Sequence, residues 1–389
     1  MAAAAHGSDI RHQRRAPSTV GTVDLDFYPA TIGGTVSTTP QEIALLRLVA
    51  QRVAGPGLAT AAEAVRWLAA LQAQDYNGVL TSVALRTTSG TRPDVEAALN
   101  AGEIVRSWPM RGTLHLVVAE DLPWMLHLTA GRMVAGAAAR RDALGLDMTV
   151  LEQARQLAVN ALRGGGQLRR TDLLARWNEG GLNTTGQRGY HTLWHLAQIG
   201  TLCFGPVCDG EQLIVLVDEW IPHPLRPERE EALAQWALRY FRGHGPATSK
   251  DFARWTKLVA SDVRAGLALA RQQLARISVD GVDYFMDPRT PDLLATCRSL
   301  ARGVFLLPGF DEFILGYQDR SAAVPVEFAD RIVPGGNGVF RPTVVSDGQV
   351  VGTWKHAGRG ATRSVAATPF RAFPGGVAEG IRHVYAALP

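Results

Sequence analysis

Two copies of one helix-and-turn pattern, about eighty residues apart, constrain the fold of this 389-residue chain more than any other feature. In each copy an amphipathic helix, over 151–162 or 230–241, leads into a glycine followed by an aspartate and a tryptophan. These residues are Gly166, Asp172 and Trp177 in the first copy and Gly245, Asp251 and Trp255 in the second. The glycine-to-aspartate spacing is the same in both, so the repeat predicts tandem units of one kind.

The same elements are predicted after both copies. We expect third helices over 190–199 and 261–275, and each is followed by a short hairpin, over 202–217 or 277–286, with an Asp-Gly turn. Three helices and a two-stranded wing form the winged-helix pattern, in which the third helix enters a DNA groove. A helical scaffold that uses such units for protein contacts is the alternative.

A third unit is expected near the N-terminus, from helices over 41–54 and 61–71 and a strand over 112–118. Beyond residue 300, prolines break helices, and the strands predict a small antiparallel sheet or barrel; they span 304–307, 313–317, 343–345 and 350–354. The predicted fold is α+β, predominantly helical, with three tandem winged-helix domains and a small C-terminal antiparallel β-barrel. The predicted boundaries are 1–38 (disordered), 39–125, 126–222 and 223–295 (winged helices), and 296–389 (barrel).

Positive charge is concentrated near the C-terminus. The formal net charge is only +4, but residues 331–389 contain seven Lys or Arg against two acidic residues. A GC-rich genome would explain the overall excess of Arg over Lys, but it does not explain this clustering. Lys355 and Arg359, which follow a predicted hairpin strand, are therefore candidate phosphate contacts, as are Arg188 and Arg264 at the two third helices.

Several classes of protein are disfavoured. No apolar run approaches the roughly 20 residues needed to cross a bilayer, and the N-terminus lacks the pattern of a secretory signal. The sequence contains no metal-binding cluster, phosphate loop or Gly-x-Ser-x-Gly elbow. Three cysteines, Cys203, Cys208 and Cys297, are expected to be reduced thiols. We therefore expect a cytoplasmic protein without membrane attachment, metal or cofactor.

Gln72 and Gln74 stand at the predicted end of the second helix. Residues two apart diverge on a helix but point the same way on an extended segment. The two amides therefore converge if the helix ends before them, and the following Asn77-Gly78 favours such an ending. On their own, two glutamines at a helix end are most often solvated surface residues.

Two further segments carry polar groups at predicted strand ends. Over 106–117, Trp108, Arg111 and His115 are candidate DNA contacts, although a hydrogen-bonded structural role is an equal alternative for His115. Over 307–320, Asp311 and Glu312 could act in acid–base chemistry. A network that locks domains together is the favoured interpretation of this pair.

Five blocks of the sequence, in this order, resemble the bacterial winged-helix DNA-binding domain family that contains the AlkZ and YcaQ DNA glycosylases. They are LQAQDY, VRSWPMRGTLHLV, RYFRGHGPATSKDFARW, LLPGFDEFILGYQDR and NGVFRPTVVSDGQVVGTW. The resemblance runs from about residue 41 to the C-terminus and is closer to the AlkZ branch, whose catalytic motif is Gln, an apolar residue, Gln. That motif maps onto Gln72, Ala73 and Gln74, and the small Ala73 is a slight departure.

The resemblance implies three tandem winged helices with a C-terminal β-barrel, and excision of bulky N7-alkylpurines, interstrand crosslinks included, in self-resistance or repair. Gln72 and Gln74 would be catalytic, without metal or cofactor, on double-stranded DNA that carries alkylated purines. We expect a monofunctional, monomeric enzyme in which water attacks C1′. A non-catalytic winged-helix regulator is the leading alternative, and an interaction module without DNA binding is the next.

Overall fold

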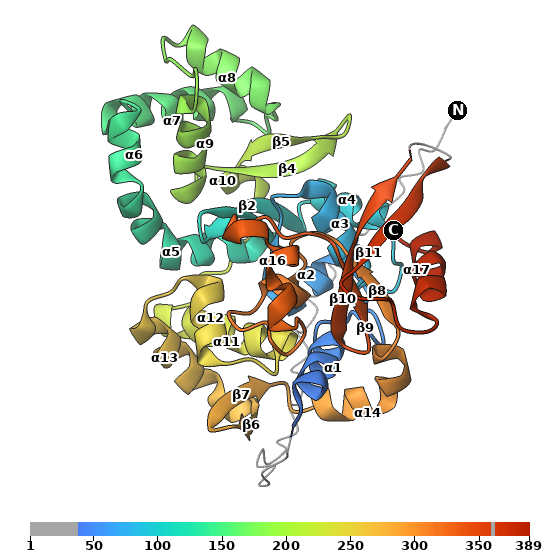
Figure 1. Cartoon of the computed structure of the whole chain (residues 1–389). Helices are drawn as coiled ribbons and strands as arrows, with labels where there is room; N and C mark the ends of the chain where they lie inside the picture. Colours follow the sequence, from blue (N-terminus) through green and yellow to red (C-terminus); the bar gives the residue numbers. More distant parts are fainter. Residues whose placement is uncertain (1–37, 359–361) are drawn as a thin grey trace, which may run out of the picture.

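The computed structural model describes residues 38–358 and 362–389. The expectations for residues 1–37 and for Arg359 lie outside this part of the chain. In Figure 1 the helices of the first repeat copy (green) lie at the top, those of the second (yellow) at the lower left, and the C-terminal sheet (red) at the right. Helices and antiparallel sheets are both present, as predicted.

Both repeat copies contain the predicted three helices and a hairpin. The first consists of α7 (Met148–Leu162), α8 (Arg170–Glu179), α9 (Arg188–Gln198), β4 (Leu202–Cys208) and β5 (Glu211–Leu216). The second consists of α11 (Arg229–His244), α12 (Ser249–Thr256), α13 (Ala260–Ala270), β6 (Ala275–Val279) and β7 (Val282–Met286). The repeated tryptophans, Trp177 and Trp255, are both buried, so the repeat pattern marks equivalent core positions.

The N-terminal unit has more elements than the sequence predicts. They are α1 (Pro40–Ala50), α2 (Ala61–Leu68), β1 (Leu71–Gln72), α3 (Tyr76–Ala84), α4 (Arg92–Asn100), β2 (Ile104–Met110) and β3 (Thr113–Val118). Trp67 of α2 donates its indole N–H to the carbonyl of Ala50, 2.7 Å away. Trp177 likewise bonds to the Ala154 carbonyl of α7, so the second helix meets the first in the same way in these two units.

The hairpin of the N-terminal unit (β2 and β3) and the hairpin of the first repeat copy (β4 and β5) share one sheet. The sequence did not indicate this shared sheet. Its strand order is β1-β3-β2-β4-β5, and β2 joins β4 where Arg106 pairs with Phe204. Between the two hairpins the chain forms α5 (Leu122–Gly136) and α6 (Ala138–Ala143), and α10 (Val217–Trp220) follows β5. The shared sheet therefore joins the N-terminal unit to the first repeat copy and supports β1 at its edge.

The C-terminal part contains a sheet that is open. It includes α14 (Thr290–Ala301), β8 (Val304–Leu307), α15 (Glu312–Leu315), α16 (Ala329–Ile332), β9 (Thr343–Ser346), β10 (Gln349–Ala357), β11 (Ser364–Pro369) and α17 (Val377–Ala386). The strand order is β11-β10-β9-β8, and within the described residues it does not close. The predicted barrel is therefore corrected to a four-stranded sheet. Helix α17 packs on β8 and β11 and buries Val377 and Ile381 against Leu306 and Val344, so a helix rather than strand closure covers the apolar face.

The strand predicted over 313–317 is instead the short helix α15. The carboxylate of Asp311 accepts the amide of Phe313 at 2.9 Å and so caps the helix. Apolar residues in a short run look the same in a buried strand and a buried helix, and the aspartate before them decides the outcome here.

Asp311 also forms a buried ion pair that joins the N-terminal unit to α15. Two nitrogens of Arg86 lie 2.9 Å from the two carboxylate oxygens of Asp311, and Ser82 donates to the same carboxylate at 2.5 Å. Arg86 also donates to Gln51, 2.9 Å away at the end of α1. Burial would raise the pKa of Asp311, but the Arg86 charge and these hydrogen bonds lower it overall. The favoured interpretation of Asp311 as part of a locking network is confirmed.

We expect Arg86→Ala to lower the free energy of unfolding by about 3–5 kcal/mol, because it leaves a buried carboxylate without its cation. Chemical denaturation of wild type and variant measures this change. The matched control is Arg155→Ala, which removes an exposed pair with Glu152 on α7 and should leave the midpoint nearly unchanged. Equal effects of the two substitutions would contradict a structural role for the Arg86–Asp311 pair.

Candidate active site

Gln72 and Gln74 lie at the edge of the first sheet. Helix α2 ends at Leu68, three residues before the predicted end at 71, and Ala69 adopts a positive φ of 63°. The chain then extends as β1, which pairs with β3. Gln72 is therefore in a strand and Gln74 in the bend that follows it, so the helix ends before both glutamines, the condition under which the sequence predicts that they converge.

The two amide side chains are hydrogen-bonded to each other. Nε2 of Gln72 donates to Oε1 of Gln74 at 2.7 Å, and the main-chain amide of Gln74 donates to Oε1 of Gln72 at 3.1 Å. Gln72 is buried whereas Gln74 is exposed. The pair therefore spans the boundary between the core and solvent.

Ala73 points to the opposite side of the strand and is fully buried. Its main chain is held on both sides: its amide donates to Leu114 at 2.7 Å, and Arg106 donates to its carbonyl at 2.8 Å. Successive side chains of a strand point to opposite faces, so Ala73 packs into the apolar core while Gln72 lies on the polar face. Packing thus explains the apolar position of the motif.

His115 lies directly opposite Gln72 in the sheet, and Ser107 lies opposite His115. Opposed residues of antiparallel strands place their Cβ atoms about 4.5–5.5 Å apart on one face. Gln72, His115 and Ser107 therefore form a row across three strands. Within the described residues, the buried hydroxyl of Ser107 has no hydrogen-bond partner.

His115 is held neutral in one tautomer. Its Nδ1 lies 2.8 Å from the carbonyl of Thr113, and its Nε2 lies 2.7 Å from Nη2 of Arg111. A carbonyl can only accept, so Nδ1 carries the proton and Nε2 accepts from Arg111. Burial, and then the Arg111 charge, hold the pKa of His115 well below its ordinary value.

The burial of Trp108 and His115 corrects the prediction that they contact DNA. Trp108 is 2% exposed, and its ring packs against Phe204 and Tyr190; His115 is 0% exposed. Neither side chain offers a surface to a duplex. Arg111 is partly buried and bonded to His115, so it supports the site from within.

Glu312 is the site residue whose contact the sequence does not reveal. One of its carboxylate oxygens accepts the main-chain amide of Gln72 at 3.1 Å, across 240 residues of chain. The acidic pair at 311–312 is visible in the sequence, but no local pattern tells which carboxylate faces the glutamines.

The remaining predicted cations are not brought together. Arg188 donates to the main-chain carbonyls of Asn183, Leu144 and Gly145, which occupies part of its guanidinium. Arg264 on α13 and Lys355 on β10 are exposed. Figure 1 shows α9, α13 and β10 in separate regions of the molecule.

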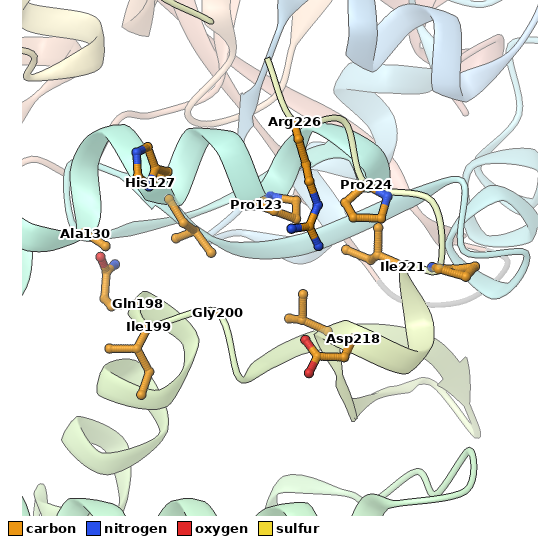
Figure 2. Close-up of a pocket in the computed structure, with 13 residues that line it drawn as sticks. Pro123, His127, Ala130, Gln198, Ile199, Gly200, Asp218, Ile221, Pro224 and Arg226 are labelled. Carbon is orange, nitrogen blue, oxygen red and sulfur yellow. The ribbon is translucent and has the colours of Figure 1, made fainter. Parts of the chain in front are cut away.

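A cavity of about 440 Å³ lies between α5, the end of α9 and the segment after α10. Figure 2 shows His127, Gln198, Asp218 and Arg226 around it. None of the residues predicted from the sequence to act in the site lines this cavity. Gln198 links it indirectly to the site region, because its Nε2 donates to the Trp108 carbonyl at 2.8 Å.

Residues 38–358 and 362–389 contain neither a metal-binding group nor a membrane-spanning helix. No group of three or more His, Cys, Asp or Glu there is placed to hold a metal ion. No helix in this part of the chain is both long and apolar enough to span a membrane.

A family model described as DNA glycosylase AlkZ-like matches residues 65–388. The match identifies the protein as a DNA glycosylase, a hydrolase of N-glycosidic bonds that acts on DNA. The chain belongs to the AlkZ-like DNA glycosylase family, which confirms the resemblance seen in the sequence and decides against a non-catalytic regulator.

Comparison with a curated relative supports the AlkZ branch. A Streptomyces sahachiroi protein named interstrand DNA cross-link repair glycosylase is 26% identical over 310 residues, which cover 76% of this chain and 82% of that protein. The solved structure of the S. sahachiroi DNA glycosylase AlkZ matches with a TM-score of 0.74 and 24% identity, over 91% of this chain and 96% of that one. The second likeness shows a common fold.

Because His115 is neutral when folded, acid should weaken the fold through this residue. An unfolded histidine takes up a proton below about pH 6.5, while the lowered pKa keeps His115 unprotonated in the folded state. The contribution is therefore complete above pH 6.5 and is lost as the pH falls, by up to about 1.4 kcal/mol per pH unit. Denaturation of wild type and His115→Asn between pH 7.5 and 5.5 measures this slope. Parallel curves for the two proteins would show that His115 titrates normally.

Proposed function

We propose that the protein excises bulky N7-alkylpurines from duplex DNA, with Gln72 and Gln74 as the catalytic pair. The hydrogen-bonded amides at a partly exposed strand edge are the observation that carries the proposal. Each amide carbonyl has two lone pairs and so retains acceptor capacity beyond the bond within the pair. Those lone pairs suit a water molecule that approaches C1′.

An amide catalyst fits this substrate on physical grounds. A glutamine does not ionise, so it is a poor general base, but an N7-alkylated purine is already cationic and departs without protonation. The enzyme then needs only to position water and to stabilise the sugar cation with oriented carbonyl dipoles. Normal purines lack the charged leaving group and are spared. The products are a free base and an abasic site.

The bulk of the adduct fits the exposure of the site. A tight base-flipping pocket would exclude large adducts, whereas exposed Gln74 faces solvent. The relative named as an interstrand cross-link repair glycosylase supports cross-linked DNA as a substrate. We include such crosslinks in the proposed substrate class, within self-resistance or repair, and propose a monomeric cytoplasmic enzyme.

The duplex is proposed to lie across tandem winged-helix domains with the boundaries given above, reached by the basic C-terminal hairpin. The two confirmed three-helix-and-hairpin units support this arrangement. Lys355 is exposed on β10, the longest strand of the C-terminal sheet, and Arg359 follows two residues after that strand. Within the described residues, Lys355 forms none of the main-chain carbonyl bonds that occupy Arg188.

We expect Gln72→Ala and Gln74→Ala each to slow base release by at least about 100-fold, the lower range for losing a positioned catalytic group. The double variant should lose less than the sum in free energy, because both amides hold one water. Gln74→Glu should keep appreciable activity, since a carboxylate also orients water and favours a cation. Single-turnover excision from duplex carrying a bulky N7-guanine adduct is the measurement.

Duplex affinity should barely change in these variants, because neither glutamine is assigned to a phosphate. Gln272→Ala, at an exposed glutamine after α13, is the matched control and should excise like wild type. Wild-type rates in both alanine variants would remove the glutamines from the chemistry.

Replacing Lys355 and Arg359 with Ala should weaken binding to every duplex sequence. Each lost phosphate contact releases about one fewer counterion, so the log–log dependence of affinity on salt should flatten by roughly two units. Titration of a labelled duplex over a range of salt concentrations measures the slope. An unchanged slope would place the DNA elsewhere, with Arg188 and Arg264 as the next positions to replace.

A further inference from the structure

Glu312 is a fully buried carboxylate at which four elements of the structure meet. It is the first residue of α15 and accepts from Gln72 of β1 through one oxygen, at 3.1 Å. Its other oxygen accepts from Nε1 of Trp255 on α12 at 2.8 Å and lies 3.4 Å from Nε2 of His244 on α11. Both oxygens are thus directed by groups from separate parts of the chain.

Glu312 differs from its neighbour Asp311 in how its charge is compensated. Asp311 has the bidentate bond from Arg86. Within the described part of the chain, no lysine or arginine forms an ion pair with Glu312. Its ion-pair partner among these residues is the imidazole of His244, 3.4 Å away, which carries a charge only when it is protonated. A buried carboxylate without a permanent cation is costly to the fold.

The repeat itself marks the Trp255 contact as unusual. The equivalent tryptophans are Trp67 in the N-terminal unit and Trp177 in the first repeat copy. Each donates to a main-chain carbonyl of its own unit, that of Ala50 or Ala154. Only Trp255 of these three donates to a side chain outside its unit, that of Glu312. The second repeat copy therefore lacks the bond that the other two units share, and its tryptophan instead holds a carboxylate beside β1.

A cation lies nearby without neutralising Glu312 by contact. The guanidinium of Arg111 stacks over the ring of Trp255, 5.9 Å from its centroid, and bonds to His115. Burial lowers the pKa of Arg111, and the charge of Glu312 opposes that shift. Glu312, Trp255, Arg111 and His115 thus form a support behind Gln72.

We propose that Glu312 is a positioning residue of the glycosylase: it fixes the main chain of Gln72 and places a negative charge behind the amide pair. The amide of Gln72 faces away from β3, because Ala73 rather than Gln72 makes the next bond to that strand. On the side of Gln72 that faces away from β3, Glu312 holds the main chain, and the bonds to Gln74 hold the side chain. The negative charge favours the sugar cation that develops in front of the pair. This inference rests on the proposed function of Gln72 and Gln74.

The test is Glu312→Gln, which keeps the size of the side chain and removes its charge. Single-turnover excision of an N7-guanine adduct should slow at least about 10-fold, while the affinity for the adducted duplex changes less than twofold. Hydrogen exchange at the amide of residue 72 should accelerate, which reports the loss of positioning directly. Glu152→Gln, which removes the charge of an exposed carboxylate on α7, is the matched control and should excise like wild type.

The outcomes separate this inference from the function on which it rests. Two results would overturn the positioning role while Gln72→Ala stays inactive in the same assay. One is excision by Glu312→Gln at the wild-type rate. The other is a loss of excision that is accompanied by a loss of duplex affinity and a fall in melting temperature. Base release that is unaffected by Gln72→Ala and Gln74→Ala would overturn the proposed catalytic pair as well. Should Glu312→Gln fold poorly, Glu312→Asp, which keeps the charge but withdraws it from Gln72, should still accelerate exchange at residue 72.

Discussion

The buried pair between Arg86 and Asp311 is the interaction on which the geometry of the site depends. It joins α3, two residues beyond its end, to the first turn of α15, and through Gln51 it reaches α1. The residue after Asp311 is Glu312, so the same contact that connects the two ends of the chain sets the carboxylate beneath β1. The Arg86–Asp311 pair therefore both stabilises the fold and positions a residue of the candidate site.

Much of the architecture could be predicted because it is encoded locally. Helix periodicity, capping residues and Asp-Gly turns act over a few residues, and they located α7 to α9, α11 to α13 and both hairpins. Two predictions failed for different reasons. The run after Asp311 is a helix because of a local cap, which the apolar pattern alone does not reveal. The C-terminal strands stay open because α17, from a later part of the chain, covers their apolar face.

The candidate site likewise has features that the sequence predicts and features that it does not. The convergence of Gln72 and Gln74 follows from a two-residue spacing on an extended segment, which the sequence shows. The burial of Trp108 does not, because it depends on α9 and β4 packing against it from a later part of the chain. The bond from Glu312 to Gln72 spans 240 residues, and no pattern within a window of ordinary length contains it.

The unequal exposure of the two glutamines has an evolutionary consequence. Gln72 and Ala73 are enclosed by the sheet, so substitutions there disturb packing as well as chemistry. Gln74 projects into solvent, where most side chains are tolerated. A substitution at position 74 can therefore change the amide pair without first destabilising the fold.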